Sequence, residues 1–210
     1  MNGRRVERTR TLGSTGARLL GLEGRSLVLA SASPRRAELL RGLGIEFERR
    51  SPRTEEAIRA GEAPRTAVER LARSKAESGI RDGEDALVVG ADTLVVLDGE
   101  PLEKPRDTDQ AADMLRSLSG RGHDVVTGVA VVRTADRAVF SGTESTRVRF
   151  RTLDEEEIDI LVGEAMDKAG AYGIQGLASL VVESVDGDYF NVVGLPLLLL
   201  RRLVKEATTR

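Results

Sequence analysis

The sequence predicts an α/β (α+β) protein in which helices flank a twisted, mixed β-sheet and two lobes enclose a cleft. Apolar runs of strand length alternate with amphipathic stretches of helical length, which favours helices packed against one sheet. The 210 residues are enough for one domain with a hydrophobic core. No internal repeat and no linker rich in Pro, Gly or Ser divides the chain, so residues 26–210 are expected to form a single domain.

The first elements are predicted from an apolar run followed by helix signals. Residues 27–30 are expected to form the first strand. The Ser-Pro pair at residues 33–34 supplies an N-cap and a first-turn proline to a helix that ends at Gly44. Residues 45–48 alternate like a strand, and a second helix is expected at residues 64–79.

The middle of the chain predicts a long strand, a turn and a helix. Residues 86–97 form an apolar run that is expected to break near residues 90–93. The Asp-Gly pair at residues 98–99 is a strong hairpin signal. Asp107 is the expected cap of a helix whose apolar face extends to Leu118.

The last part of the chain predicts two hairpins and two helices. Thr152 and Glu155 fit the capping box of a short acidic helix. Pro196 is expected to begin a C-terminal helix. The two hairpins are predicted from four strand-like segments, at residues 125–132, 139–150, 180–185 and 189–193.

Composition excludes several kinds of chemistry. The absence of Cys removes disulfides, thiolate metal sites and cysteine nucleophiles. With one histidine, His123, a multi-histidine metal site is impossible, and this residue is expected to be structural or solvated rather than catalytic. A net charge of −2 and 3% aromatic residues give little support to nucleic-acid binding. No apolar run approaches the roughly 20 residues that span a bilayer, so no membrane segment is expected.

The first 25 residues differ from the rest in charge. They hold six Arg against two Glu, which makes them +4 and the remainder −6. We expect residues 1–25 to be a disordered tail or to lie before the true start of the protein. An Arg-rich, acid-poor start also fits a targeting peptide, and this alternative stays open.

A first candidate site lies at residues 31–36 (SASPRR), between the first strand and a helix N-terminus. Backbone N–H groups and the positive helix end favour an anion there, and Arg35 and Arg36 add bidentate donors suited to phosphate. A capped helix with two solvated arginines is the alternative.

Further candidates are a carboxylate, two lysines and a glycine-rich loop. Asp92, in Gly90-Ala91-Asp92-Thr93, could serve as a general base or hold Mg²⁺, although it could also only shape a turn. Triphosphates favour lysine and metals favour carboxylates, but each such charge alone is usually on the surface. In residues 169–176 (AGAYGIQG), glycines allow close approach to a flat ligand and Gln175 offers both donor and acceptor. The remaining charged candidates are Glu55, Glu56, Lys75 and Lys104. Together these features suit phosphoryl or nucleotidyl chemistry on a small nucleotide.

Five segments carry a specific resemblance. They are SASPRR at 31–36, GADT at 90–93, LEKP at 102–105, AGAYGIQG at 169–176 and VGLP at 193–196. In this order and spacing they resemble the Maf family of nucleoside triphosphate pyrophosphatases, over about residues 27–203. The resemblance implies a single catalytic domain at 26–210 with a nucleotide cleft between its lobes. It also implies hydrolysis of a nucleoside triphosphate to the monophosphate and pyrophosphate with Mg²⁺ or Mn²⁺.

The resemblance also implies residue roles. Asp92 would be the proton acceptor that activates water, and Glu56 would hold the metal with Asp92. Lys75 and Lys104 would bind phosphates or stabilise the leaving pyrophosphate, as charge develops there. The phosphate pocket would be lined by Ser31, Ser33 and Arg36.

The subfamily follows from three positions. The motifs resemble the pyrimidine-type members, whereas members acting on 7-methyl-GTP carry Trp, Gln and Glu in place of Arg35, Thr93 and Gln175. A uracil or thymine edge has both donor and acceptor, which suits the amide of Gln175. The resemblance therefore implies specificity for dTTP and UTP, including modified pyrimidine triphosphates, in a housekeeping role against non-standard nucleotides. It also implies a cytoplasmic protein and a homodimer.

Other functions stay open at this point. The main alternative is a nucleotide-binding regulator of cell division and septum formation that needs no turnover. A purine triphosphate pyrophosphatase of related shape is a third hypothesis, which Gln175 and Arg35 disfavour for 7-methyl-GTP.

Overall fold

One mixed sheet of seven strands organises the molecule, as the sequence predicted. The computed structural model describes residues 14–22, 24–55, 57–163, 166 and 168–209. β1 pairs in parallel with β2 and β3, and the other pairings are antiparallel. The strand order is β2 (Glu48–Arg50), β1 (Ser26–Ala30), β3 (Ala86–Leu97), β5 (Gly122–Arg133), β6 (Ala138–Phe150) and β7 (Val182–Asp186), with β4 (Glu100–Leu102) on β3.

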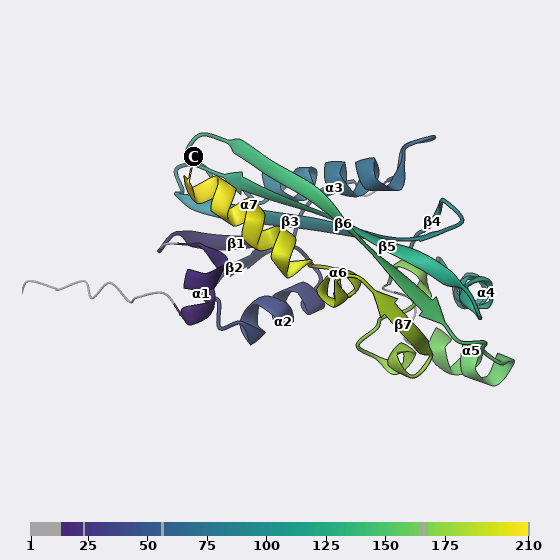
Figure 1. The fold of residues 1–210 in the computed structure, drawn as a ribbon. Helices are drawn as coiled ribbons and strands as arrows, with labels where there is room; N and C mark the ends of the chain where they lie inside the picture. Colours follow the sequence, from purple (N-terminus) through teal and green to yellow (C-terminus); the bar gives the residue numbers. More distant parts are fainter. Residues whose placement is uncertain (1–13, 23, 56, 164–165, 167, 210) are drawn as a thin grey trace, which may run out of the picture.

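Helices cover both faces of this sheet (Figure 1). One face carries α3 (Pro64–Ser78), and the other carries α1 (Thr15–Leu20), α2 (Pro34–Gly42) and α7 (Leu197–Thr209). The far end of the sheet is covered by α4 (Thr108–Leu118) and α5 (Glu155–Val162), while the short α6 (Tyr189–Val193) precedes α7. Within the described residues, no helix is both long and apolar enough to cross a membrane.

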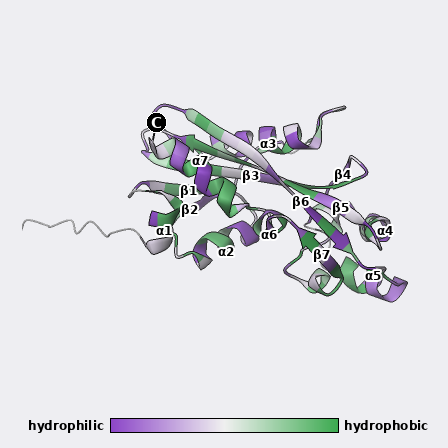
Figure 2. Cartoon of the chain, in the orientation of Figure 1, coloured by the Kyte–Doolittle hydropathy of each residue, from purple (hydrophilic) through white to green (hydrophobic). Residues whose placement is uncertain are grey.

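Two hydrophobic clusters define the two expected lobes. The first joins α1, α2 and α7 to β1 and to the first half of β3 and the second half of β5, for example through Ala91 and Val129. The second joins α4 and α5 to the second half of β3 and the first half of β5, for example through Val95 and Val125. Figure 2 shows hydrophobic and hydrophilic residues alternating along α7, as a helix with one buried face requires, whereas β3 and β5 are buried along almost their whole length.

Two glycines let α3 lie unusually close to the sheet. A Cβ on Gly90 of β3 would lie 2.3 Å from the Ala72 carbonyl oxygen of α3. A Cβ on Gly128 of β5 would lie 2.3 Å from the Val68 carbonyl oxygen. Both distances are far below contact distance, so only glycine permits this packing, and α3 is held in register over β3.

We expect Gly128→Ala to destabilise the protein by about 1–3 kcal/mol, because the added methyl group must push α3 off the sheet. The matched control is Gly42→Ala at the end of α2, where an added Cβ meets nothing within 4 Å. That variant should leave stability unchanged or raise it by about 0.4–1 kcal/mol. Urea unfolding measures both, and equal effects would contradict the close packing.

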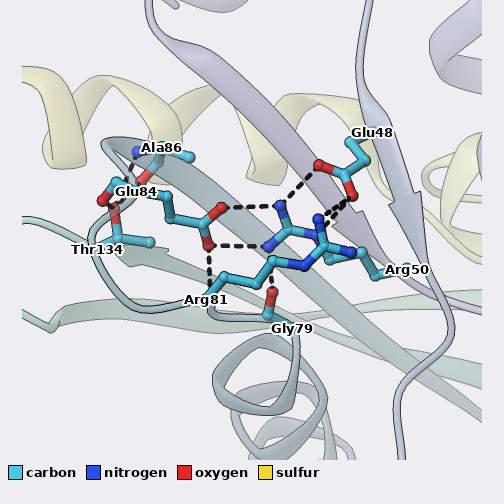
Figure 3. Close-up of polar contacts among 7 residues, drawn as sticks. All are labelled: Glu48, Arg50, Gly79, Arg81, Glu84, Ala86 and Thr134. Carbon is cyan, nitrogen blue, oxygen red and sulfur yellow. Dashed lines mark hydrogen bonds and ion pairs between the residues drawn. The ribbon is translucent and has the colours of Figure 1, made fainter.

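The edge strand β2 is fastened by a network of charged side chains (Figure 3). The Arg50 guanidinium donates to both carboxylate oxygens of Glu84, at 2.8 and 2.7 Å, and to both oxygens of Glu48. It also donates to the Gly79 carbonyl, where α3 ends. These hydrogen bonds from Arg50 lower the pKa of Glu84. The network holds β2 against the connection between α3 and β3.

Four local expectations were wrong. β3 is one continuous strand, because its ladder with β5 runs unbroken from residue 87 to residue 96. The strand expected at residues 45–48 is β2 at 48–50, where pairing with β1 is available. Residues 189–193 form α6, which Asp188 caps, so the last expected hairpin is absent. The capping box of α5 uses Asp154 and Glu157, two residues later than predicted.

Part of the expected N-terminal tail packs on the core. Ser14 caps α1, and Leu20 and Leu22 are buried in the first cluster, so the ordered chain begins earlier than residue 26. A Cβ on Gly16 would lie 1.9 Å from the Leu43 carbonyl oxygen, which shows how closely α1 approaches the end of α2. Residues 1–13 and 23 of that segment lie outside the described residues.

Candidate active site

An interruption in the sheet creates the site. Along one edge of β3, pairing with β1 ends at Gly90 and pairing with β4 begins at Val95. In the described chain, residues 91–94 therefore have no strand partner on this edge. Successive side chains of a strand point to opposite faces, so Asp92 faces α3 while Thr93 faces the other layer. Because the sheet is open here, both can reach one cavity.

A cavity of about 510 Å³ lies at this opening, between the two lobes. The structure brings together nine of the ten predicted site residues in its lining: Ser31, Ser33, Arg35, Arg36, Lys75, Asp92, Thr93, Lys104 and Gln175. The tenth, Glu56, lies outside the described residues. Glu103 and Lys168 also line the cavity and were not predicted, although each lies in or beside one of the motifs.

Asp92 and Lys75 form a buried ion pair at the α3 face of the cavity. The Lys75 ammonium lies 2.6 Å from Asp92 Oδ1, and the two residues are only 4% and 8% exposed. The glycine contact beneath α3 sets this distance, because Gly90 lies under Ala72 and Ala76, next to Lys75. The second oxygen of Asp92 has no hydrogen-bond partner among the described residues, so it is available to a ligand, a proton or a cation.

Arg36 lines the cavity, but its guanidinium donates hydrogen bonds to other parts of the protein. Its guanidinium donates to the carbonyls of Gly194 at 2.7 Å and Ala91 at 2.9 Å. It also donates to the hydroxyls of Ser31 at 3.3 Å and Thr93 at 3.0 Å. Ala91 is one of the residues without a strand partner on the open edge, so Arg36 replaces the missing strand there. Arg36 is therefore a clamp that ties together the loop after β1, the open stretch of β3 and the connection between α6 and α7.

The loop that precedes α2 is held by side chains rather than by the predicted cap. The Ser33 side chain makes no cap hydrogen bond, and the Ser31 hydroxyl instead accepts from the Ser33 N–H at 3.2 Å. Arg49 of β2 donates to the carbonyls of Ser31 and Ala32. The fastened edge strand thus fixes the shape of the loop that faces the cavity.

The cavity is cationic although the chain is not. Among the residues that the structure describes, five cationic side chains line it against the carboxylates of Asp92 and Glu103, whereas the whole chain carries −2. Such a surplus of positive charge in a cleft favours a polyanion. The cations are Arg35, Arg36, Lys75, Lys104 and Lys168.

The glycine-rich loop is anchored by His123. Gly170, at φ +66°, packs so tightly on Val95 that a Cβ would lie 2.8 Å from that side chain. His123 Nε2 lies 2.7 Å from the Tyr172 hydroxyl, and burial lowers the pKa of His123 to about 4. His123 is therefore a neutral structural residue and not a solvated one, which decides between the two expected roles. Gln175, further along the loop, is exposed and lines the cavity.

The donor set suits a hard cation bound together with a phosphorylated ligand. Among the described residues, no three His, Asp or Glu side chains gather to hold a metal ion. Mg²⁺ is commonly held by one or two carboxylates plus phosphate oxygens and water. The available oxygen of Asp92 provides one such carboxylate, which fits that mode and does not fit an all-protein metal cage.

Fold and cavity together define an α/β protein whose buried carboxylate–lysine pair lies in a cationic cleft shaped for a phosphorylated ligand. The chain belongs to the Maf-like protein family, which matches residues 26–207. This confirms the resemblance drawn from the five motifs.

Curated relatives cover most of the chain. A protein of Syntrophomonas wolfei is 52% identical over 173 residues, which are 80% of this chain and 90% of the relative. One of Bacillus velezensis is 46% identical over 182 residues, 86% of this chain and 95% of the relative. One of Escherichia coli O157:H7 is 50% identical over 176 residues, 82% of this chain and 88% of the relative. Each of these relatives is named dTTP/UTP pyrophosphatase.

Proposed function

We propose that this protein is a nucleoside triphosphate pyrophosphatase that hydrolyses dTTP and UTP to the monophosphate and pyrophosphate. The observation that carries the proposal is the cationic cleft with the Asp92–Lys75 pair inside it. The dTTP/UTP pyrophosphatases that are about half identical to the chain support the same substrates. The same hydrolysis would remove non-standard pyrimidine triphosphates, a housekeeping role that we place in the cytoplasm.

In the proposed reaction, water attacks the α-phosphorus and the bond to the β-phosphate oxygen breaks. Asp92 accepts the proton of the attacking water, since its second oxygen is available in the cavity. Charge moves onto the leaving pyrophosphate, and Lys104 stabilises it electrostatically. Lys75 holds the Asp92 carboxylate in place at 2.6 Å and contributes positive charge beside the phosphates.

A divalent cation, Mg²⁺ or Mn²⁺, belongs to the proposal. Asp92 would hold it together with phosphate oxygens, and Glu56 is the second proposed ligand. When bound, it would supply Lewis-acid stabilisation of phosphate charge. Ser31 and Ser33 line the cavity, and their proposed role is to bind the phosphates. Arg36 hydrogen-bonds to the protein, so its proposed role is to shape this wall of the cleft.

Specificity is assigned to Arg35, Thr93 and Gln175. The amide of Gln175 can donate to one group of a uracil or thymine edge and accept from another. A carboxylate at this position could only accept. Gln175, which is exposed, and Thr93 both line the cavity, so the base would be held between the two lobes.

We therefore expect Gln175→Glu to lower kcat/KM for UTP about tenfold or more relative to a purine triphosphate, because a donor to the pyrimidine carbonyl is lost. The ratio of kcat/KM values for UTP and GTP measures the effect. Gln110→Glu in α4 is the matched control, since Gln110 acts there through its accepting oxygen toward Arg106. An unchanged ratio in Gln175→Glu would remove this residue from base recognition.

The test of the proposed function is pyrophosphate release from dTTP, UTP, CTP, GTP, ATP and 7-methyl-GTP, each with and without Mg²⁺ or Mn²⁺. Metal-dependent release that favours dTTP and UTP, with the monophosphate as co-product, is the expected result. Nucleotide binding without any release would overturn it in favour of a regulator. Size-exclusion chromatography with light scattering on the same sample tests the proposed homodimer.

A further inference from the structure

Three oxygen atoms form a row that begins at Thr93 and runs away from the cavity. Thr93 Oγ1 lies 3.0 Å from Thr127 Oγ1, and Thr127 Oγ1 lies 3.1 Å from the backbone carbonyl oxygen of Asn191. At the other end, Arg36 Nη2 donates to Thr93 Oγ1 at 3.0 Å. Thr127 and Asn191 are fully buried, and the proposed reaction uses neither.

Counting hydrogens fixes the direction of this row. Each of the two oxygen–oxygen contacts needs one hydrogen, because two lone pairs facing each other at these distances would repel. The Asn191 carbonyl carries no hydrogen, so the Thr127 hydroxyl must donate to it. The hydrogen between Thr93 and Thr127 must then come from Thr93.

Thr93 is left without a hydrogen for the cavity. Its one hydroxyl hydrogen points to Thr127, and one of its lone pairs accepts from Arg36. A hydroxyl has two acceptor lone pairs, so the second remains for a ligand. Thr93 can therefore accept a hydrogen bond from a ligand, and it cannot donate one.

The far end of the row is rigid. The Asn191 amide donates to the Val125 carbonyl at 2.8 Å and to the Thr146 hydroxyl at 3.0 Å. Thr146 in turn donates to the Asp188 carbonyl at the cap of α6. These contacts tie α6 to β5 and β6, so the carbonyl that receives the Thr127 hydrogen cannot turn away.

We propose that Thr127 is a positioning residue that makes Thr93 an acceptor-only contact for the nucleotide. The inference rests on the proposed function. The matching group on the substrate is a hydrogen-bond donor, either the N3–H of uracil and thymine or the 3′-hydroxyl of the sugar. Cytosine presents an acceptor at N3 and would face the Thr93 oxygen lone pair to lone pair. Thr127, which lies behind Thr93, would then set the selection against nucleotides that present an acceptor to Thr93.

The test compares Thr127→Val with Thr127→Ser. Valine keeps the shape of threonine but cannot accept the Thr93 hydrogen, which becomes free to turn into the cavity. Serine retains the hydroxyl and is the matched control. The Asn191 carbonyl also accepts from the Gly194 N–H at 3.0 Å, so the valine variant leaves it hydrogen-bonded.

The readout is kcat/KM for UTP relative to CTP, in which the N3–H donor becomes an acceptor, and relative to 3′-O-methyl-UTP, in which the sugar hydroxyl loses its hydrogen. In Thr127→Val, the ratio of kcat/KM for UTP to kcat/KM for one of these analogues should fall about tenfold. The analogue whose ratio falls identifies the donor as N3–H or the sugar hydroxyl. Thr127→Ser should keep both ratios at their wild-type values. A merely structural role would lower all three kcat/KM values in parallel and leave the ratios unchanged, which would overturn the proposal.

The outcome is separable from failure of the proposed function. Absence of UTP hydrolysis by the wild-type protein would refute the enzyme, and the same ratios would then be read from dissociation constants of the three nucleotides. Where thermal unfolding shows that the valine variant does not fold, Thr127→Ala repeats the test, since alanine also cannot accept the Thr93 hydrogen. Unchanged ratios in a folded variant count against the proposal in either assay.

Discussion

Replacing Asp92 by Asn is expected to lower kcat for dTTP and UTP by about 10² or more, the scale of losing a general base. The amide has nearly the same shape, so it preserves the packing beneath α3 but cannot accept the proton of the attacking water. It also weakens the contact with Lys75, whose ammonium lies 2.6 Å from Asp92 Oδ1 in the native protein. Pyrophosphate release under saturating substrate measures the loss.

Two comparisons make the Asp92 result decisive. Asp82→Asn removes a fully exposed carboxylate and should retain wild-type kcat, since its one contact is a surface pair with Arg137 at 3.3 Å. Circular dichroism and urea unfolding must show that Asp92→Asn is folded at the assay temperature. A folded variant with wild-type kcat would exclude Asp92 as the proton acceptor.

Replacing Arg36 by Met is expected to cost at least about 3 kcal/mol of unfolding free energy, because several buried acceptors lose a charged donor at once. The Ala91 carbonyl belongs to β3 and the Gly194 carbonyl to the connection between α6 and α7, and both accept hydrogen bonds from Arg36. We therefore expect kcat/KM to fall more than stability alone explains, since the clamp that shapes this wall of the cleft is lost.

Arg41→Met provides the control for Arg36. Arg41 lies in the same helix and is exposed, with its guanidinium 5.7 Å from the Phe47 ring centre. Loss of this cation–π contact should cost no more than about 1 kcal/mol. Urea unfolding of both variants at equal protein concentration gives the comparison, and equal costs would show that Arg36 is not the clamp.

Local signals were enough to predict much of the fold. The α3 and α4 helices were predicted from their apolar faces, Pro64 and Asp107, and these features act within a few residues of one another. The cavity lining was also predictable in outline, because four of the five motif segments lie at the end of an element or in a loop, and the fifth, at residues 90–93, lies in the open stretch of β3. Nine of the ten predicted site residues line the same cavity.

Non-local contacts decided the elements that local signals misjudged. Residues 90–93 contain Gly, Asp and Thr, which favour a break, yet pairing with β5 continues through them. Residues 189–193 are apolar and strand-like, but Asp188 and the positive φ of Gly194 delimit a helix turn held by the Asn191 side chain. Backbone partners of this kind lie 34 to 66 residues away, beyond the range of any local pattern.

By itself, the sequence determined the fold class, the family resemblance and most of the residues that meet in the cleft, because each depends on residue type and short spacing. The tertiary structure alone decided what those residues do to one another. It shows Arg36 as a clamp, Lys75 paired with Asp92, and Thr127 turning the Thr93 hydroxyl away from the cavity. Such roles depend on which donors and acceptors are buried together, and only the folded chain brings those groups into contact.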